Sequence, residues 1–389
     1  FYSYHPPLGF LLARSVYLLG FSPFISAKIL SLIASLAAFF FLRASLQYLK
    51  LLSSPVGIGF LYITSLIPAQ MYLTTSVNLD GMILAYASAA LYLSILLFWD
   101  SDTKKRTWLR NTSYSSLLVL SMLAAVMTKF NGVFTLAIPF LVVCTRPLSS
   151  HVKSKKEFMK MCTAASLLTI TVIILALPYY FGRYYVSEGT FFPSNGQVYD
   201  SHGQRIGAEI RDRDPWGYLV RLFEPAPKKK KNIEFRDLDE NRLQDAWTDF
   251  WIRDPFIGGP SYFSKAVSSI YIHIASWLLW LGLYLYLVVF RMQGRNNWNR
   301  LGLFFILFGT VLWLALITYA YRSPCTGCYT MKGIYIAPLM WFIGYLLVQP
   351  ISFLNALPKK TKDYVFWANI LCFIVIGIFG IINHVVPVY

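Results

Sequence analysis

Charged side chains are scarce in this chain. They make up 14% of its 389 residues, whereas soluble globular domains carry about 25%. Hydrophobic residues reach 56%, and the mean hydropathy is +0.52. Several apolar runs approach or exceed the length of about 20 residues that crosses a bilayer core. This composition excludes an ordinary soluble domain and predicts an all-α polytopic membrane protein.

Acidic residues are rarer still outside one segment, because 13 of the 18 lie within 184–265. The formal net charge of the whole sequence is +17. Nucleic-acid binding requires a stripe of basic residues on a soluble face. The basic residues of this chain are instead spread over many short loops and form no such stripe. Nucleic acid is thus excluded as a partner.

Cysteine is also scarce, and five cysteines are too few for a disulfide scaffold. Cys325 and Cys328 form a CTGC segment with no further Cys or His nearby at the spacing of a zinc site. A local disulfide and two free thiols both remain open for this pair.

Apolar runs predict about ten membrane spans. The run at 8–21 is shorter and contains Arg14, and it predicts an interfacial helix from which this side chain reaches water. The spans are expected near 24–47, 55–76, 79–99, 113–128, 132–147, 161–183, 266–290, 301–320, 332–350 and 364–386.

Lysine and arginine gather in alternate short loops, and this predicts which side of the membrane each loop faces. Under the positive-inside rule these loops are cytosolic. They contain Arg43, Lys50, Lys104, Lys105, Arg106, Arg110, Arg146, Lys153, Lys155, Lys156, Lys160, Arg291, Arg295, Arg300, Lys359, Lys360 and Lys362. The opposite side, which is extracytoplasmic or lumenal, then contains His5-Pro6-Pro7, Asp80, Lys129, the segment 184–265 and the turn 321–332.

The same pattern divides the chain into three parts. Residues 1–183 form an N-terminal transmembrane part that includes the first outer loop. Residues 184–265 form a large extracytoplasmic loop, and residues 266–389 form a C-terminal transmembrane part. The loop is too long to be a simple connection, since loops of this length are usually functional or disordered.

Asp80 is the one acid in or beside a predicted span that lies away from the long loop and from the cytosolic side. Ionisable residues at membrane depth are functional candidates by default. The alternative is that Asp80 only caps a helix, since Asp favours that position. The two roles are compatible.

Three basic residues share this outer boundary: Lys129 ends one span, Arg322 follows another and Lys332 begins the next. Arg and Lys are natural partners of phosphate. Together with Asp80 and His5 they predict a site for an anionic head group at the membrane surface.

Several motifs resemble membrane-embedded glycosyltransferases of the GT-C superfamily, most closely the protein O-mannosyltransferase and aminoarabinose transferase group. They are HPPLG, SLIPAQMYLTTSVNLDGMILAYASAALYLSILL, MLAAVMTKFNGVFTLAIPFLV and TMKGIYIAPLMWFIGYLL. They follow the family's order along most of the chain. Phe10 stands where the mannosyltransferases usually carry a basic residue, and 184–265 is too short for the β-trefoil module of the eukaryotic enzymes.

The resemblance implies a GT-C-like bundle that transfers a sugar from a dolichyl- or undecaprenyl-phosphate donor to a protein, lipid or glycan acceptor on the outer face. It implies catalytic roles for Asp80 and His5, with Lys129, Arg322 and Lys332 on the lipid phosphate. It also implies a principal acid upstream of Phe1. The sequence requires no metal and leaves a divalent cation open as a cofactor.

The resemblance implies a multi-pass protein of a bacterial or archaeal plasma membrane, or of the endoplasmic reticulum. Membrane lipids are then expected partners, and whether the chain also joins a membrane complex stays open. Two other functions remain open. The first is a transporter or flippase of a lipid-linked substrate, although transporters often place polar groups at the membrane midplane. The second is a catalytically silent scaffold subunit of the same fold.

Overall fold

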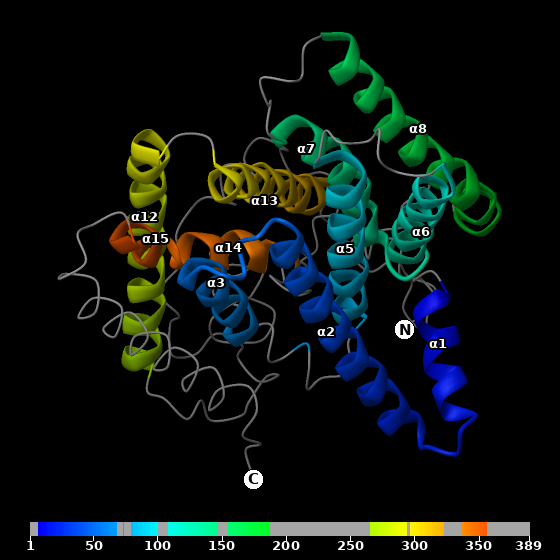
Figure 1. Cartoon of the computed structure of the whole chain (residues 1–389). Coiled ribbons are helices and arrows are strands. Elements are labelled where there is room, and N and C mark those ends of the chain that lie inside the picture. Colours follow the sequence, from blue (N-terminus) through cyan, green and yellow to red (C-terminus); the bar gives the residue numbers. More distant parts are fainter. Residues whose placement is uncertain are drawn as a thin grey trace.

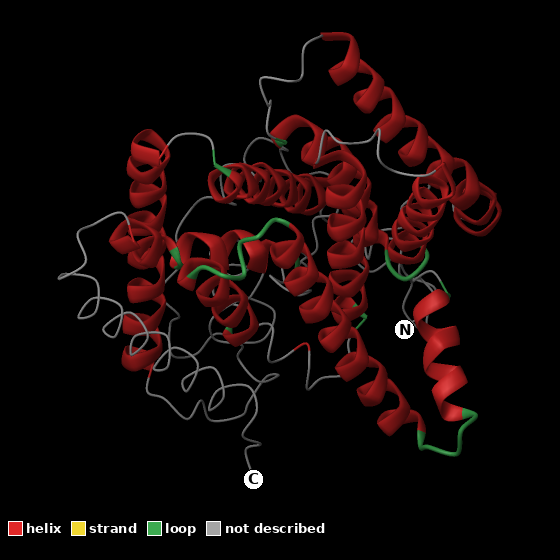
Figure 2. Cartoon of the chain, in the orientation of Figure 1, coloured by secondary structure: helices red, strands yellow, loops and turns green. Residues whose placement is uncertain are grey.

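The computed structural model describes residues 7–67, 73, 79–99, 108–146, 155–186, 265–293, 296–322 and 337–355. Within these residues every regular element is a helix and there is no strand (Figure 2). The α-helices are α1 (Leu8–Tyr17), α2 (Pro23–Tyr48), α3 (Pro55–Leu66), α5 (Asp80–Ser94), α6 (Trp108–Val126), α7 (Ile138–Thr145), α8 (Lys155–Tyr180), α12 (Lys265–Gln293), α13 (Asn297–Arg322), α14 (Leu339–Leu347) and α15 (Gln349–Asn355). The π-helices η1 (Ile95–Trp99) and η4 (Phe181–Tyr185) extend α5 and α8, and η3 (Phe130–Ala137) is a 3-10 helix.

Two of these helices begin with the same local signal, a serine followed by a proline. The Ser22 hydroxyl accepts a hydrogen bond from the N–H of Ile25, and Pro23 is the first residue of α2. The Ser54 hydroxyl accepts one from Gly57 at the start of α3. A serine cap satisfies an N–H that has no partner within the helix, and proline at the first position loses no helical bond.

Four helical stretches in the described part of the chain are long and apolar enough to cross a membrane: Pro23–Tyr48, Asp80–Trp99, Glu157–Tyr185 and Asn297–Thr318. Their burial differs widely, since the apolar window of Asp80–Trp99 is 83% buried and that of Glu157–Tyr185 is 22% buried. The less buried helices expose large apolar side chains, among them Phe24, Ile33 and Phe40 on α2 and Leu167, Ile170 and Ile174 on α8. Wide exposed apolar surfaces of this kind are typical of a protein surrounded by lipid.

Three predicted spans differ from the helices observed. The run 55–76 predicts one helix, but α3 ends at Leu66. Ile67 adopts an extended backbone, the conformation that the following Pro68 favours. Likewise, η3 and α7 divide the run 132–147. In the run 332–350, the nine-residue helix α14 ends before Val348. The expected span 364–386 lies outside the described residues.

Helix α5 occupies the centre of the N-terminal part and packs against α2, α6 and α7, while α8 packs on α6 (Figure 1). A second group consists of α3, α12, α13 and α14. In Figure 1, α13 and α14 run across the direction of α5 and α12. The described helices therefore do not form a simple parallel bundle.

Helix ends meet in two separate places. At the first, which we call the Asp80 pole, the start of α1 and the ends of α6 and α8 meet the start of α5. The N–H of Leu8 donates to the carbonyl of Met127 at 3.0 Å, and the Tyr180 hydroxyl donates to the carbonyl of Val126 at 2.9 Å.

At the second place, the Arg146 pole, the ends of α2, α5 and α7 meet the start of α13. The Trp99 indole N–H donates to Asn297 Oδ1 at 3.4 Å, and Asn297 Nδ2 donates to the carbonyl of Leu49 at 3.5 Å. Arg146 Nη1 donates to the carbonyl of Phe98 at 3.4 Å.

Candidate functional site

Asp80 is the first residue of α5, and its side chain is 1% exposed. The preceding residue, Leu79, occupies the N-cap position and makes no side-chain capping bond. A carboxylate in the first helical turn interacts favourably with the helix dipole. Two hydrogen bonds of Asp80, however, reach a distant segment, and local capping does not explain these two.

That distant segment is the break between α6 and η3. Helix α6 ends at Val126, and the Thr128 hydroxyl donates to the carbonyl of Ala124 at 2.7 Å. Lys129 then takes an extended backbone, with φ −162° and ψ 152°, before η3 begins. The turn at Met127 and Thr128 and this extended residue together interrupt the helix beside the start of α5, where Lys129 and Asn131 contact Asp80.

The geometry of the three side chains is that of a buried, hydrogen-bonded ion pair. Lys129 Nζ lies 2.8 Å from Asp80 Oδ2, and Asn131 Nδ2 donates to Asp80 Oδ1 at 2.8 Å. Both carboxylate oxygens therefore accept hydrogen bonds. The Lys129 side chain is 13% exposed and Asn131 is also partly exposed, so Asp80 is the fully buried member of the trio.

Glycine is required in the same break. A Cβ on Gly132 would collide with the backbone carbonyl of Ala125. The Gly132 N–H donates to the carbonyl of Lys129 at 2.9 Å. The close approach of η3 to the end of α6 therefore fixes where Lys129 and Asn131 lie.

Helix α1 covers this site from the N-terminal side. The bond from Leu8 N–H to Met127 ties its first residue to the α6 end. A Cβ on Gly9 would contact the side chains of Leu79 and Thr128. The segment that directly follows the predicted proline elbow thus lies beside the ion pair.

An aromatic cluster stands next to the trio. Phe130 packs on Tyr180 and Tyr184 with ring centroids 5.8 and 5.1 Å apart, and Tyr179 contacts both tyrosines. The guanidinium of Arg183 lies 5.7 Å from the Tyr184 ring. Sequence reasoning missed this cluster and Asn131. The signals were present as the aromatic run YYFGRYY and as the KFNG segment.

The structure brings together two of the five predicted site residues, Asp80 and Lys129. Arg322 is the last residue of α13, and its side chain is outside the described part of the chain, as are His5 and Lys332. Cys325 and Cys328 also fall outside it. Within the described residues, no three or more His, Cys, Asp or Glu side chains lie together as metal ligands would.

Comparisons of the chain with protein families, with curated proteins and with solved structures return no match.

Proposed function

We propose that this chain is a membrane glycosyltransferase that moves a sugar from a polyprenyl-phosphate donor to an acceptor at the Asp80 pole. In this proposal the Asp80 pole faces the outside of the cell or the lumen, and the fold is of the GT-C kind. The observation that carries the proposal is the buried Asp80–Lys129–Asn131 trio beside the start of α1.

A buried ion pair is an expensive feature for stability alone. Withdrawing two charges from water costs roughly several kcal/mol per ion. Replacing a buried ion pair with well-packed apolar residues often leaves the stability of a protein unchanged or raises it. Charged residues at membrane depth commonly mark substrate sites. A functional demand explains why a chain so poor in acids has one buried at this helix end.

The trio has the chemical groups that sugar transfer from a lipid phosphate needs. The bond from the sugar C1 to the phosphate oxygen breaks, a bond from C1 to the acceptor oxygen forms, and the acceptor proton passes to a base. The leaving phosphate gains negative charge, which a fixed cation in a low-dielectric site stabilises. Lys129 has three N–H donors, so its bond to Asp80 is compatible with a phosphate contact.

The carboxylate of Asp80 then orders the acceptor or receives its proton, a role for which Asp and Glu are common. In the neighbouring aromatic cluster, Phe130 and Tyr179 are partly exposed and offer rings against which a sugar can pack, while the buried Tyr180 and Tyr184 support them. His5, Arg322 and Lys332 remain part of the proposal through the family resemblance.

The positions of the charges favour transfer over transport. Among the described residues, the buried charged side chains are Asp80, Arg146 and Arg300. Asp80 lies at the Asp80 pole, and Arg146 and Arg300 lie at the Arg146 pole. None of the three lies along the middle of a helix. Transporters often bind their substrate with polar groups at the midplane.

The test is sugar transfer by the full chain in membranes, with a radiolabelled polyprenyl-phosphate sugar as donor. The Asp80→Asn variant should lose activity by about a hundredfold or more, the range for an acid–base group. Glu157→Gln is the matched control, because it removes one acid at the opposite end of the molecule and should leave transfer unchanged.

A double variant separates catalysis from structural support. Asp80→Asn/Lys129→Gln removes both charges together, so neither charge is left buried without its partner. If transfer stays absent while the double variant is folded, present in normal amounts and no less stable than Lys129→Gln, the trio acts in the reaction. Normal transfer by Asp80→Asn protein present in normal amounts would refute the proposal and favour a scaffold role.

A further inference from the structure

Arg146 is a buried arginine that the proposed reaction does not use. It follows α7, and it is 1% exposed. Its Nη1 donates to the carbonyl of Phe98 at 3.4 Å and contacts the sulfur of Met161. Within the described residues its Nε and Nη2 atoms are buried without a hydrogen-bond partner.

These two atoms form one edge of the guanidinium, the edge that binds the two oxygens of a carboxylate or phosphate in parallel. A buried donor without a partner costs about 1–3 kcal/mol, and more when it is charged. The unused edge of Arg146 therefore points to an anionic ligand.

A second arginine adds to the positive charge at this place. Arg300, in the first turn of α13, is 9% exposed, and its Nη1 donates to the carbonyl of Arg146. Lys160 lies close by on α8, and Glu157, one turn before it, interacts electrostatically with Arg146. Lys160 is exposed, but the two buried arginines carry two positive charges against the half-buried Glu157, and this excess is costly in a low-dielectric surrounding unless an anion is present.

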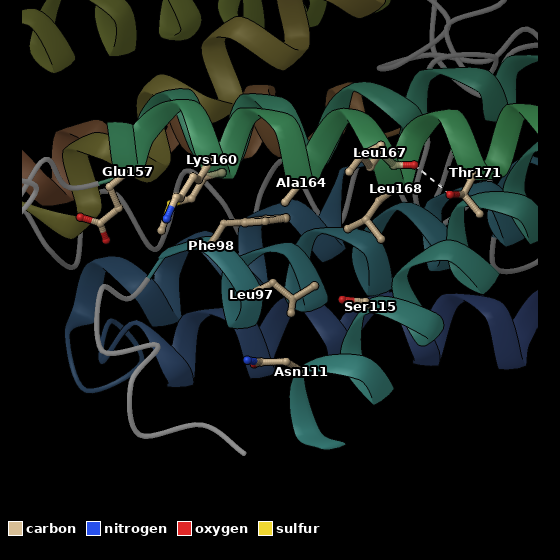
Figure 3. Close-up of a pocket in the computed structure, with 11 residues that line it drawn as sticks. Leu97, Phe98, Asn111, Ser115, Glu157, Lys160, Ala164, Leu167, Leu168 and Thr171 are labelled. Atoms are coloured by element: carbon tan, nitrogen blue, oxygen red, sulfur yellow. Dashed lines mark hydrogen bonds between the residues drawn. The ribbon is translucent and has the colours of Figure 1, made fainter. Parts of the chain in front are cut away.

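A groove of about 490 Å³ opens beside these residues between η1, α6 and α8 (Figure 3). Glu157 and Lys160 lie toward one end of it, and Leu168 and Thr171 toward the other. Apolar side chains make up most of the wall between, including Leu97, Phe98, Ala164 and Leu167. Asn111 and Ser115 of α6 also line it, and Thr171 at the far end donates its hydroxyl to the carbonyl of Leu167. The charged groups thus lie at one end and apolar side chains form most of the remaining wall, which fits an amphiphile.

Met161 connects the groove with the buried arginine, because it lines the groove and contacts Arg146 Nη1. Methionine is unbranched and adopts many rotamers. Arg146 is not among the residues that line the groove, so a ligand in the groove reaches the guanidinium only after Met161 changes its rotamer.

We propose that the Arg146 pole binds an anionic phospholipid, with its phosphate on the free edge of Arg146 and an acyl chain in the groove. The charge of Arg146, Arg300 and Lys160 is complementary to the phosphate, and the apolar wall is complementary to the chain. The positive-inside rule predicts that this pole lies on the cytosolic side. On that side of a membrane, basic pockets between helices bind the head groups of anionic lipids. The site is separate from the Asp80 pole, and its test does not depend on sugar transfer.

The experiment measures lipid binding to the purified full chain by native mass spectrometry, with phosphatidylglycerol and phosphatidylcholine as probes. We expect phosphatidylglycerol to bind more tightly, and Arg146→Gln to weaken it by about tenfold or more, as the loss of a charged hydrogen bond predicts. The matched control is Arg43→Gln, which removes an exposed arginine of α2. Glu157→Gln should strengthen binding, because it removes the one acid beside the phosphate.

Two further measurements keep the proposal open to refutation if Arg146→Gln does not fold. Ala164→Phe leaves both arginines intact and fills the groove, so it should weaken phosphatidylglycerol binding. Glycerol phosphate, which has the phosphate without acyl chains, should fail to compete. Equal binding of the two lipids, equal loss in the Arg43→Gln control, or competition by glycerol phosphate as strong as by the lipid would each overturn the proposal.

Discussion

The ion pair between Asp80 and Lys129 predicts a strong coupling in stability that a double-mutant cycle can measure. At the 2.8 Å separation of Nζ and Oδ2, the Coulomb attraction is about 6 kcal/mol for an effective dielectric constant of about 20. Most of this attraction offsets the cost of withdrawing both groups from water. Removal of one partner alone leaves that cost without compensation, and such losses are typically about 3–5 kcal/mol.

The two partners should not respond equally. Asp80→Asn should lower the free energy of unfolding by about 3 kcal/mol, because it strands a largely buried ammonium. Lys129→Gln should cost less, about 2 kcal/mol, since Asp80 keeps its hydrogen bond to Asn131. The double variant should also cost only about 2 kcal/mol, which makes it about 3 kcal/mol better than the sum of the single changes.

The assay is equilibrium unfolding of the full chain in mixed detergent micelles, followed by circular dichroism, with Glu157→Gln as the control for loss of one acid. If the losses of the two single variants add in the double variant to within about 0.5 kcal/mol, the side chains are not coupled. The placement of Lys129 against Asp80, and the reasoning built on it, would then be wrong.

Three other predictions concern the proposed site and the predicted topology. Gly132→Ala should destabilise the protein by about 1–3 kcal/mol and lower sugar transfer, because the added Cβ meets the Ala125 carbonyl; unchanged unfolding and transfer in this variant would contradict the tight break. His5→Ala should lower turnover by about tenfold or more with normal protein amounts, and wild-type kinetics would remove His5 from the site. Cysteines introduced by Lys104→Cys and Lys230→Cys should react with impermeant reagents from opposite sides of the membrane, the first from the cytosol, and labelling of position 230 from the cytosol would reverse the predicted orientation.

Composition predicted the coarse character of the fold, and the structure agrees with it. The described residues are helical, and four stretches suit a membrane in length and apolarity. Hydropathy averaged along the chain did not detect where a helix must stop. The extended Ile67 before Pro68 shortens one predicted span, because a single restricted backbone angle outweighs the apolar residues on either side of it.

The candidate site was predictable only in part. Asp80 and Lys129 were expected at one boundary on charge alone, and they form a direct contact. Asn131 is neutral, so nothing in a search for charges selects it, although it takes the second carboxylate oxygen. Arg146 was counted among the cations of a cytosolic loop, which predicts a solvated side chain. It is 1% exposed, because its burial depends on helices that are far from it in the sequence.

The short sequence distance within the trio has a consequence for how the protein is made. Asp80 is separated from Lys129 by 49 positions and from Asn131 by 51. All three are therefore synthesised within a stretch of about 50 residues, which takes about 3–10 seconds at about 5–20 residues per second. An aspartate and a lysine that can neutralise each other so early need not enter the bilayer as separate charges. Nascent chains arrested after residue 131 has emerged from the ribosome should then integrate more efficiently than the same chains with only one of the two charges.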